Sequence, residues 1–182
     1  TDQIYLDNSA TTRMLPEVAA AIDEAYKAGF VNPASQHQSG QHSRRALEAA
    51  RELMIQRLGG VTTGMQSDRL VLTSGGTESN NLILRGLTAG DANGNVVVAA
   101  IEHPSILETA KQLQQLGIEV RHLPVDATGV VAIERLDDLI DEYTRLVSVM
   151  LGNHETGAIQ PIREIAHIAH ARNVPVHCDA VQ

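Results

Sequence analysis

The chain has 182 residues, of which 43% are hydrophobic and 20% charged, and its formal net charge is −8. These values are typical of a globular protein with one sizeable domain. The negative charge argues against a nucleic-acid groove, which needs a basic face. No apolar run approaches the ~20 residues that a membrane helix needs. Aromatic residues make up 2% of the chain, so Leu, Ile, Val and Ala must build the core.

The N-terminus has neither a basic stretch nor an apolar signal segment. The chain contains one cysteine, Cys178. A single cysteine excludes an internal disulfide framework and is compatible with the reducing cytoplasm. We therefore expect a cytoplasmic protein.

Residues 1–60 differ in pattern from the rest of the chain. Residues 4–6 predict a short strand, and helical spacing of apolar side chains predicts helices over residues 16–28 and 40–58. The longer helix is expected to turn Met54 and Leu58 inward, and residues 32–37 form a loop between the two helices. These pieces cannot bury one another alone. We expect this helical and loop segment to pack on the main domain or on a partner chain.

Residues 61–182 alternate short apolar runs with longer helical periods. The predicted strands cover residues 70–72, 95–100, 118–123, 146–150 and 174–178. The predicted helices cover residues 78–87, 104–116 and 133–140, and a last one begins at Pro161. This alternation is typical of βαβ units and predicts an α/β fold with a mostly parallel sheet and flanking helices.

The turn Ser74-Gly75-Gly76-Thr77 lies between a predicted strand and a predicted helix. A helix N-terminus offers unpaired N–H groups and a positive dipole end, and glycines let an anion approach the backbone. Thr77 adds a hydroxyl donor. The alternative is a tight turn in which Ser74 or Thr77 caps the helix.

Asp179 stands at the C-terminal end of the last predicted strand. In open α/β sheets ligands bind at that edge. A buried carboxylate needs a cation or a strong donor, and a protonated pyridine nitrogen would serve. The alternative is that Asp179 caps the following turn. Strand alternation turns Cys178 to the opposite face, where we interpret it as a small buried hydrophobe and not as a nucleophile.

Four histidines are candidates for a functional role. His103 follows a predicted strand and could stack on an aromatic ligand or move protons, although a lone histidine there is more often structural. His154 follows another strand at the same edge and could donate hydrogen bonds to a ligand or belong to a polar turn. His167 and His170 are three residues apart on a helix but lack an evident third ligand, so we predict a solvated face and no metal site.

Several motifs occur together in one order along the chain. They are YLDNSATT (5–12), NPAS (32–35), TSGGTESNN (73–81), EH (102–103), NHETG (153–157) and DAVQ (179–182). With these motifs the chain resembles the N-terminal part of a cysteine desulfurase of the NifS/IscS kind, a pyridoxal-phosphate enzyme of the class V aminotransferase group. The resemblance runs the full length of the sequence.

The resemblance implies a set of cofactor contacts. Gly76 and Thr77 would hold the phosphate of pyridoxal 5'-phosphate, and His103, the one catalytic candidate, would stack on the pyridine ring. Asp179 would face the ring nitrogen and Gln182 would lie near the phenolic oxygen.

One motif departs from the family. The family usually has asparagine where this chain has His154, at a position that contacts cofactor or substrate. We expect His154 to donate a hydrogen bond there.

The resemblance also implies a domain and an activity. Residues 61–182 would be the first part of a cofactor-binding large domain of the type I pyridoxal-phosphate transferases. The enzyme would take sulfur from L-cysteine, leaving alanine and an enzyme persulfide, and would work as a homodimer with a sulfur-acceptor protein, as in iron–sulfur cluster assembly.

The Schiff-base lysine and catalytic cysteine of the family would lie beyond Gln182. We therefore expect a fragment that is inactive by itself. Three alternatives remain open: selenocysteine lyase, another class V lyase or aminotransferase, and a non-catalytic short homologue or assembly module.

Overall fold

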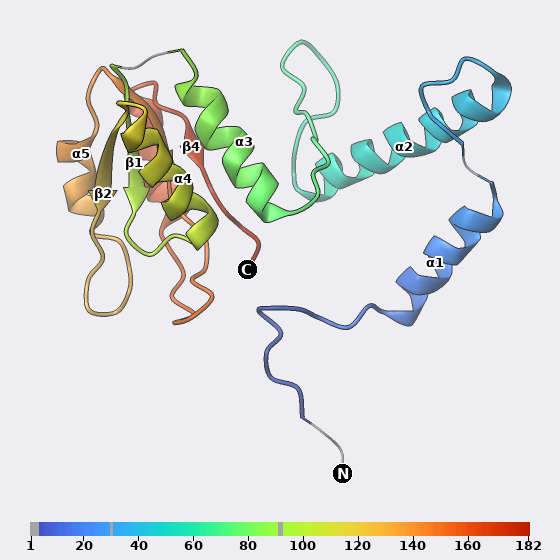
Figure 1. The fold of residues 1–182 in the computed structure, drawn as a ribbon, viewed down its shortest axis with the longest axis horizontal. Coiled ribbons are helices and arrows are strands. Elements are labelled where there is room, and N and C mark those ends of the chain that lie inside the picture. The colour runs from blue at the N-terminus through green and yellow to red at the C-terminus, as the bar shows by residue number, and fades with distance from the viewer. Residues whose placement is uncertain (1–3, 30, 91–92) are drawn as a thin grey trace. The chain divides into compact units, whose positions relative to one another are not determined.

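The computed structural model describes residues 4–29, 31–90 and 93–182. The chain divides into two compact units, Thr1–Leu72 and Thr73–Gln182 (Figure 1). Among the described residues no helix is both long and apolar enough to cross a membrane.

The first unit contains two helices, as predicted. Helix α1 (Pro16–Lys27) has its proline in the first turn, where the missing N–H costs nothing. Helix α2 (Gln38–Arg57) is capped by the His37 side chain, which accepts a hydrogen bond from the Gly40 N–H over 3.2 Å. The predicted strand at residues 4–6 is wrong, because these residues are exposed and pair with no strand.

Both helices of this unit expose apolar side chains. Helix α1 buries none of its residues, and Val18 and Ile22 are 46% and 42% exposed. Met54 of α2 is 46% exposed, and Leu58, the residue that follows this helix, is 80% exposed. The prediction that these two side chains turn inward is therefore wrong for the chain as described, because both are exposed.

The second unit is built on a parallel sheet of four strands in the order β2-β1-β3-β4. The strands are β1 (Asn95–Ala99), β2 (Glu119–Leu123), β3 (Thr144–Ser148) and β4 (Val176–His177). The predicted α/β fold with a parallel sheet is confirmed. The predicted strand at residues 70–72 is wrong, and the last strand has two residues where five were expected.

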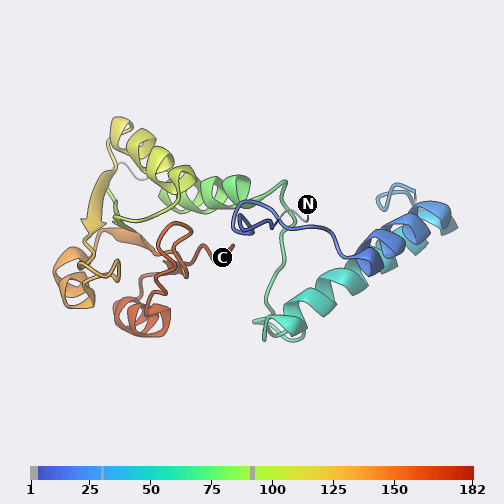
Figure 2. The ribbon, with the colours of Figure 1, turned by 90° about the horizontal axis from the view of Figure 1, so that it is seen from below.

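Helices cover both faces of the sheet (Figure 2). Helices α3 (Gly76–Thr88) and α4 (Pro104–Gln115) pack on one face, and α6 (Ile162–Ala171) packs on the other. The helix predicted at residues 133–140 is a 3₁₀ turn, Ile133–Arg135, followed by the single turn α5 (Leu136–Leu139).

Strand β1 lies in the middle of the core. Val96 and Val98 pack against Leu84 and Ile106 on the face that α3 and α4 cover. Val97 and Ala99 belong to the opposite cluster, which includes residues of α5 and α6. All five residues of β1 are buried, as expected for an interior strand of a parallel sheet covered on both faces.

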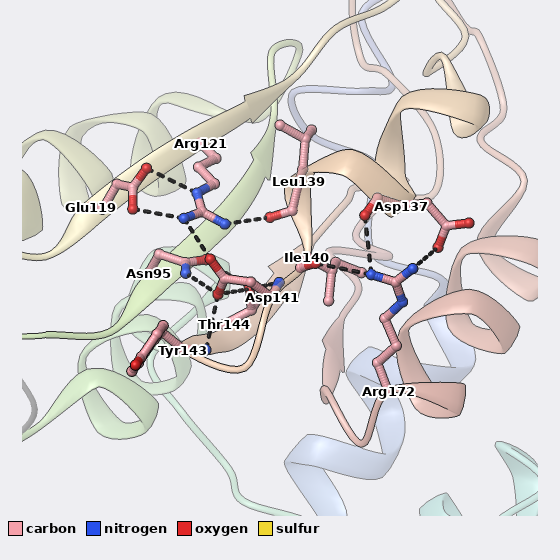
Figure 3. Close-up of polar contacts among 10 residues, drawn as sticks. All are labelled: Asn95, Glu119, Arg121, Asp137, Leu139, Ile140, Asp141, Tyr143, Thr144 and Arg172. Carbon is pink, nitrogen blue, oxygen red and sulfur yellow. Dashed lines mark hydrogen bonds and ion pairs between the residues drawn. The ribbon is translucent and has the colours of Figure 1, made fainter.

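A network of charged and polar side chains fixes the N-terminal edge of the sheet (Figure 3). Arg121 forms ion pairs with Glu119 over 2.9 Å and with Asp141 over 2.7 Å. Asn95, the first residue of β1, donates a hydrogen bond to Asp141 over 2.8 Å. Arg172 donates to the Ile140 carbonyl over 3.0 Å and so ties the end of α6 to the segment after α5.

Candidate functional site

The C-terminal ends of three neighbouring strands lead into the loops that carry most of the predicted site residues. His103 follows β1, His154 follows β3 and Asp179 follows β4. The pairing of β3 with β4 continues beyond the strands, because the Leu151 N–H donates to the Asp179 carbonyl over 2.9 Å. These three residues therefore share one edge of the sheet, where parallel α/β folds bind ligands.

Asp179 is half-buried, and hydrogen bonds hold both oxygens of its carboxylate. Oδ2 accepts from Nδ2 of Asn80 over 2.8 Å, and Oδ1 accepts from the Val181 N–H over 3.1 Å. Asp179 also lines a cavity of about 400 Å³ between residues 177–181 and the beginning of α3. A carboxylate of fixed orientation thus faces this cavity.

The beginning of α3 forms the opposite wall of this cavity. Gly76 lines it, and Thr77 is exposed on the first turn of the helix. The alternative in which Ser74 or Thr77 caps the helix is wrong, since among the described residues no side chain caps α3. The Ser74 N–H and hydroxyl instead donate to the Glu78 carboxylate over 2.7 and 2.6 Å, and these bonds lower the pKa of Glu78. Within the described part of the chain, the first turn of this helix therefore has no side-chain cap.

His103 is held by the first turn of α4. Its Nδ1 accepts a hydrogen bond from the Ser105 N–H over 3.1 Å and lies 2.8 Å from Oγ of Ser105. Nδ2 of Asn80 donates to the same hydroxyl oxygen over 2.9 Å. The rings of His103 and His154 meet edge to face, with centroids 5.5 Å apart. Asn80 and Ser105 therefore connect Asp179 to the two histidines.

Glu102 is a buried carboxyl group at this edge, with 3% of its surface exposed. Oε1 accepts from the Met150 N–H over 2.6 Å, and Oε2 has no hydrogen-bond partner among the described residues. Burial raises the pKa of Glu102 to about 8. The hydrogen bond from the Met150 N–H works against this rise, and the negative charge of Asp179 adds to it. The side chain therefore carries a proton near neutral pH and links the ends of β1 and β3.

The loop after β3 is shaped by Asn153. This buried side chain accepts from the N–H groups of Glu155 and Thr156 over 3.0 and 2.9 Å and donates to the Ile101 carbonyl over 3.1 Å. These bonds fix the turn that carries His154.

Gln182 lies beside the same loop. A Cβ atom built on Gly152 would lie 3.7 Å from Cβ of Gln182. Of the predicted site residues, Gly76 and Asp179 belong to the described lining of the cavity, whereas Thr77, His103, His154 and Gln182 do not.

Cys178 is half-buried, although we expected full burial. It contributes to the wall of the cavity with Asp179 because β4 ends at His177, so strict strand alternation no longer applies. Burial raises the pKa of the Cys178 thiol, and the nearby Glu102 and Asp179 carboxyl groups add to this. A raised pKa disfavours the thiolate, which is the nucleophilic form.

His167 and His170 occupy exposed positions of α6. Across residues 4–29, 31–90 and 93–182, no group of three or more His, Cys, Asp or Glu side chains is placed to hold a metal ion.

Sequence reasoning missed Asn80 and Ser105. Asn80 is 3% exposed and lies on the buried stripe of α3 with Leu84 and Thr88, at intervals of four residues. A polar amide in line with a core leucine was the available signal, because buried amides need partners. Ser105 gave no comparable signal.

Comparison with known proteins agrees with this geometry. The family described as Aminotransferase class-V matches residues 4–182. The chain belongs to the class-V aminotransferase family. It is 38% identical over 182 residues to the cysteine desulfurase IscS of Dictyoglomus turgidum, covering 99% of this chain and 45% of that protein. It is also 38% identical to the cysteine desulfurase IscS of Methanosarcina thermophila, covering 98% of this chain and 44% of the relative.

Solved structures of similar proteins share the fold of this class-V chain. A NifS-like protein superposes with a TM-score of 0.88 and 36% identity, over 100% of this chain and 50% of the other. A second structure, SspA in complex with cysteine, superposes with a TM-score of 0.87 and 28% sequence identity, over 97% of this chain and 50% of the other. The resemblance and the fold drawn from the motifs are therefore confirmed. The chain spans about half the length of the relatives that it matches.

Proposed function

We propose that the full-length protein is a pyridoxal-phosphate-dependent cysteine desulfurase. The observation that carries this proposal is the Asp179 carboxylate, held by Asn80 and facing the cavity beside the beginning of α3. The relatives that are named cysteine desulfurases support the choice of reaction.

The residues at this edge fit the chemistry of pyridoxal phosphate. The phosphate needs N–H donors, and the first turn of α3 offers them at Gly76 and Thr77. The basic ring nitrogen needs an anion, which Asp179 supplies, and the aromatic ring suits the imidazole of His103. When bound, the cofactor supplies an electron sink for the substrate carbon next to the amino group.

Each residue then has a defined task in the proposed site. Asp179, oriented by its two hydrogen bonds, would face the ring nitrogen and hold a proton there. His103 would cover the ring, and His154, whose ring contacts that of His103, would donate a hydrogen bond to cofactor or substrate. Gln182 would interact with the phenolic oxygen.

L-cysteine is the proposed substrate, and one of the similar structures, SspA, is a complex with cysteine. We also propose a homodimer that passes sulfur to an acceptor protein. The exposed Val18 and Ile22 of α1 support the homodimer, because the first unit alone leaves them uncovered. Residues 1–60 would then complete the assembly, and residues 61–182 would form the first part of the cofactor-binding domain.

The test uses the protein translated from the complete reading frame. After addition of pyridoxal phosphate and removal of the excess, the protein should retain the cofactor, visible by its absorbance, and form alanine and sulfide from L-cysteine under reducing conditions. L-selenocysteine and a pair of amino donor and keto acid serve as competing substrates. Cofactor retention with faster turnover of selenocysteine or of the amino donor would reject the desulfurase assignment, and failure to retain the cofactor would reject the site itself.

A further inference from the structure

Asn80 is a buried polar side chain whose hydrogen bonds reach two other segments of the chain. It is 3% exposed, and its one amide nitrogen donates two hydrogen bonds, to Oδ2 of Asp179 over 2.8 Å and to Oγ of Ser105 over 2.9 Å. An NH₂ group has two hydrogens to donate, so both are used. The two acceptors lie on segments that belong to the loop after β4 and to α4.

The orientation of the Asn80 amide follows from these partners. If the amide were turned over, its oxygen would face the Asp179 carboxylate, which has no hydrogen to donate when ionised. The nitrogen must therefore point toward Asp179.

The hydrogens of the next two groups follow in the same way. The Ser105 hydroxyl oxygen accepts from Asn80, so its own hydrogen can be donated to Nδ1 of His103, 2.8 Å away. The Ser105 N–H also donates to that Nδ1, over 3.1 Å. A neutral imidazole that accepts at Nδ1 carries its proton on Nε2.

We propose that Asn80 is a positioning residue, which holds the Asp179 carboxylate in place and orients the Ser105 hydroxyl hydrogen toward Nδ1 of His103, where this hydrogen and the Ser105 N–H together favour the Nε2–H form of the ring. The effect on the cofactor rests on the proposed function, whereas the hydrogen-bond chain itself does not. A purely structural role is the competing explanation. Leucine would satisfy that role, because it would continue the apolar stripe that Leu84 forms on α3.

Asn80→Leu in the full-length protein is therefore the decisive variant. It keeps the branched shape and the number of heavy atoms of the side chain and removes both donors. Asn81→Ala is the matched control, because the Asn81 amide lies at the next position of α3 and bonds to Thr77 and Thr109 instead of to Asp179 and Ser105. Ser105→Ala removes only the hydroxyl that relays the bond.

The first measurement is the ¹⁵N spectrum of the histidine rings in the full-length protein without cofactor. The wild type should show His103 with a protonated Nε2 and an unprotonated Nδ1. Asn80→Leu and Ser105→Ala should both move the Nδ1 resonance of His103, and Asn81→Ala should not. An unchanged His103 signal in Asn80→Leu overturns the proposal, and if that variant does not fold, an unchanged signal in Ser105→Ala does so.

The second measurement is the rate at which the loaded protein releases pyridoxal phosphate. Loss of one hydrogen bond to a charged group predicts roughly 10- to 100-fold faster release from Asn80→Leu. Release as slow as that of the wild type, or matched by Asn81→Ala, overturns the role of Asn80 toward the cofactor. A wild-type protein that never binds the cofactor rejects the proposed function instead, and the ring spectrum still decides the hydrogen-bond chain.

Discussion

Nδ2 of Asn80 lies 2.8 Å from Oδ2 of Asp179, although 99 positions separate the two residues in the chain. This contact joins the beginning of the first helix of the α/β unit to the loop after its last strand. It closes one side of the cavity that both residues line. The site is therefore held by bonds between side chains of distant segments, as well as by the strands that deliver them.

The first prediction concerns His154. If its part is to donate a hydrogen bond, His154→Asn in the full-length protein should keep the rate of alanine formation within about 5-fold of the wild type, because an amide can replace one neutral hydrogen bond of about 1 kcal/mol. His154→Leu should lower the rate further. Equal losses in the two variants would show that the imidazole itself is needed.

The second prediction uses the buried carboxyl group of Glu102, whose pKa is raised to about 8. Between about pH 4.5 and 8 the unfolded chain ionises this group and the folded chain does not, so the folded state loses stability as pH rises through that window. Glu102→Gln keeps an acceptor for the Met150 N–H and removes the titration. Its advantage in free energy of unfolding over the wild type should grow by up to about 1.4 kcal/mol per pH unit.

Urea unfolding of the full-length protein at a series of pH values measures this difference. Glu155→Gln is the control, since Glu155 is exposed in the loop after β3. Asp179 and Cys178 lie close enough to Glu102 to interact with it electrostatically. A difference between Glu102→Gln and the wild type that stays constant with pH would contradict the buried, protonated carboxyl group.

The third prediction concerns Asp141 at the opposite edge of the sheet. Partial desolvation works against ionisation, but hydrogen bonds from Arg121 and Asn95 hold the pKa of Asp141 at about 2. For a carboxylate with a lowered pKa, the stabilisation is full above the unfolded pKa near 4 and is lost as pH falls through about 2.

Arg121→Met should therefore destabilise the protein near neutral pH, by about 1 kcal/mol or less because the pair is partly exposed, and the difference from the wild type should shrink between pH 4 and 2. Arg135→Met serves as the control, since its pair with Asp138 is more exposed and spans 3.6 Å. The same loss at pH 2 as at pH 7 would show that Arg121 acts through packing alone.

The α/β unit could be predicted well from sequence because its patterns are local. Val96 to Val98 formed an apolar run, Pro104 marked a helix start, and Gly117, with φ of 94°, stands where a left-handed residue ends α4. The errors arose where local pattern and tertiary pairing disagree. Leu70 to Leu72 is as apolar as a strand, yet it pairs with no other strand among the described residues.

The candidate site could be predicted only in part. His103, His154 and Asp179 each follow a strand, so the rule on the C-terminal edges of parallel strands brought them together. Asn80 and Ser105 were missed, because they contribute to the site through hydrogen bonds to residues that are distant in sequence. The exposure of Val18 and Ile22 could not be predicted either, because helical spacing shows which side chains share a face but not what covers that face.

The most direct test of the proposed site is the rate of alanine formation from L-cysteine by the full-length protein, loaded with pyridoxal phosphate, in Asp179→Ala and Cys178→Ala. Both residues line the same cavity, but only Asp179 is proposed to act on the cofactor. Loss of an electrostatic partner at the reacting group predicts a fall of at least about 100-fold for Asp179→Ala, with Cys178→Ala close to the wild type. Equal losses in the two variants, or full activity in Asp179→Ala, would contradict the account.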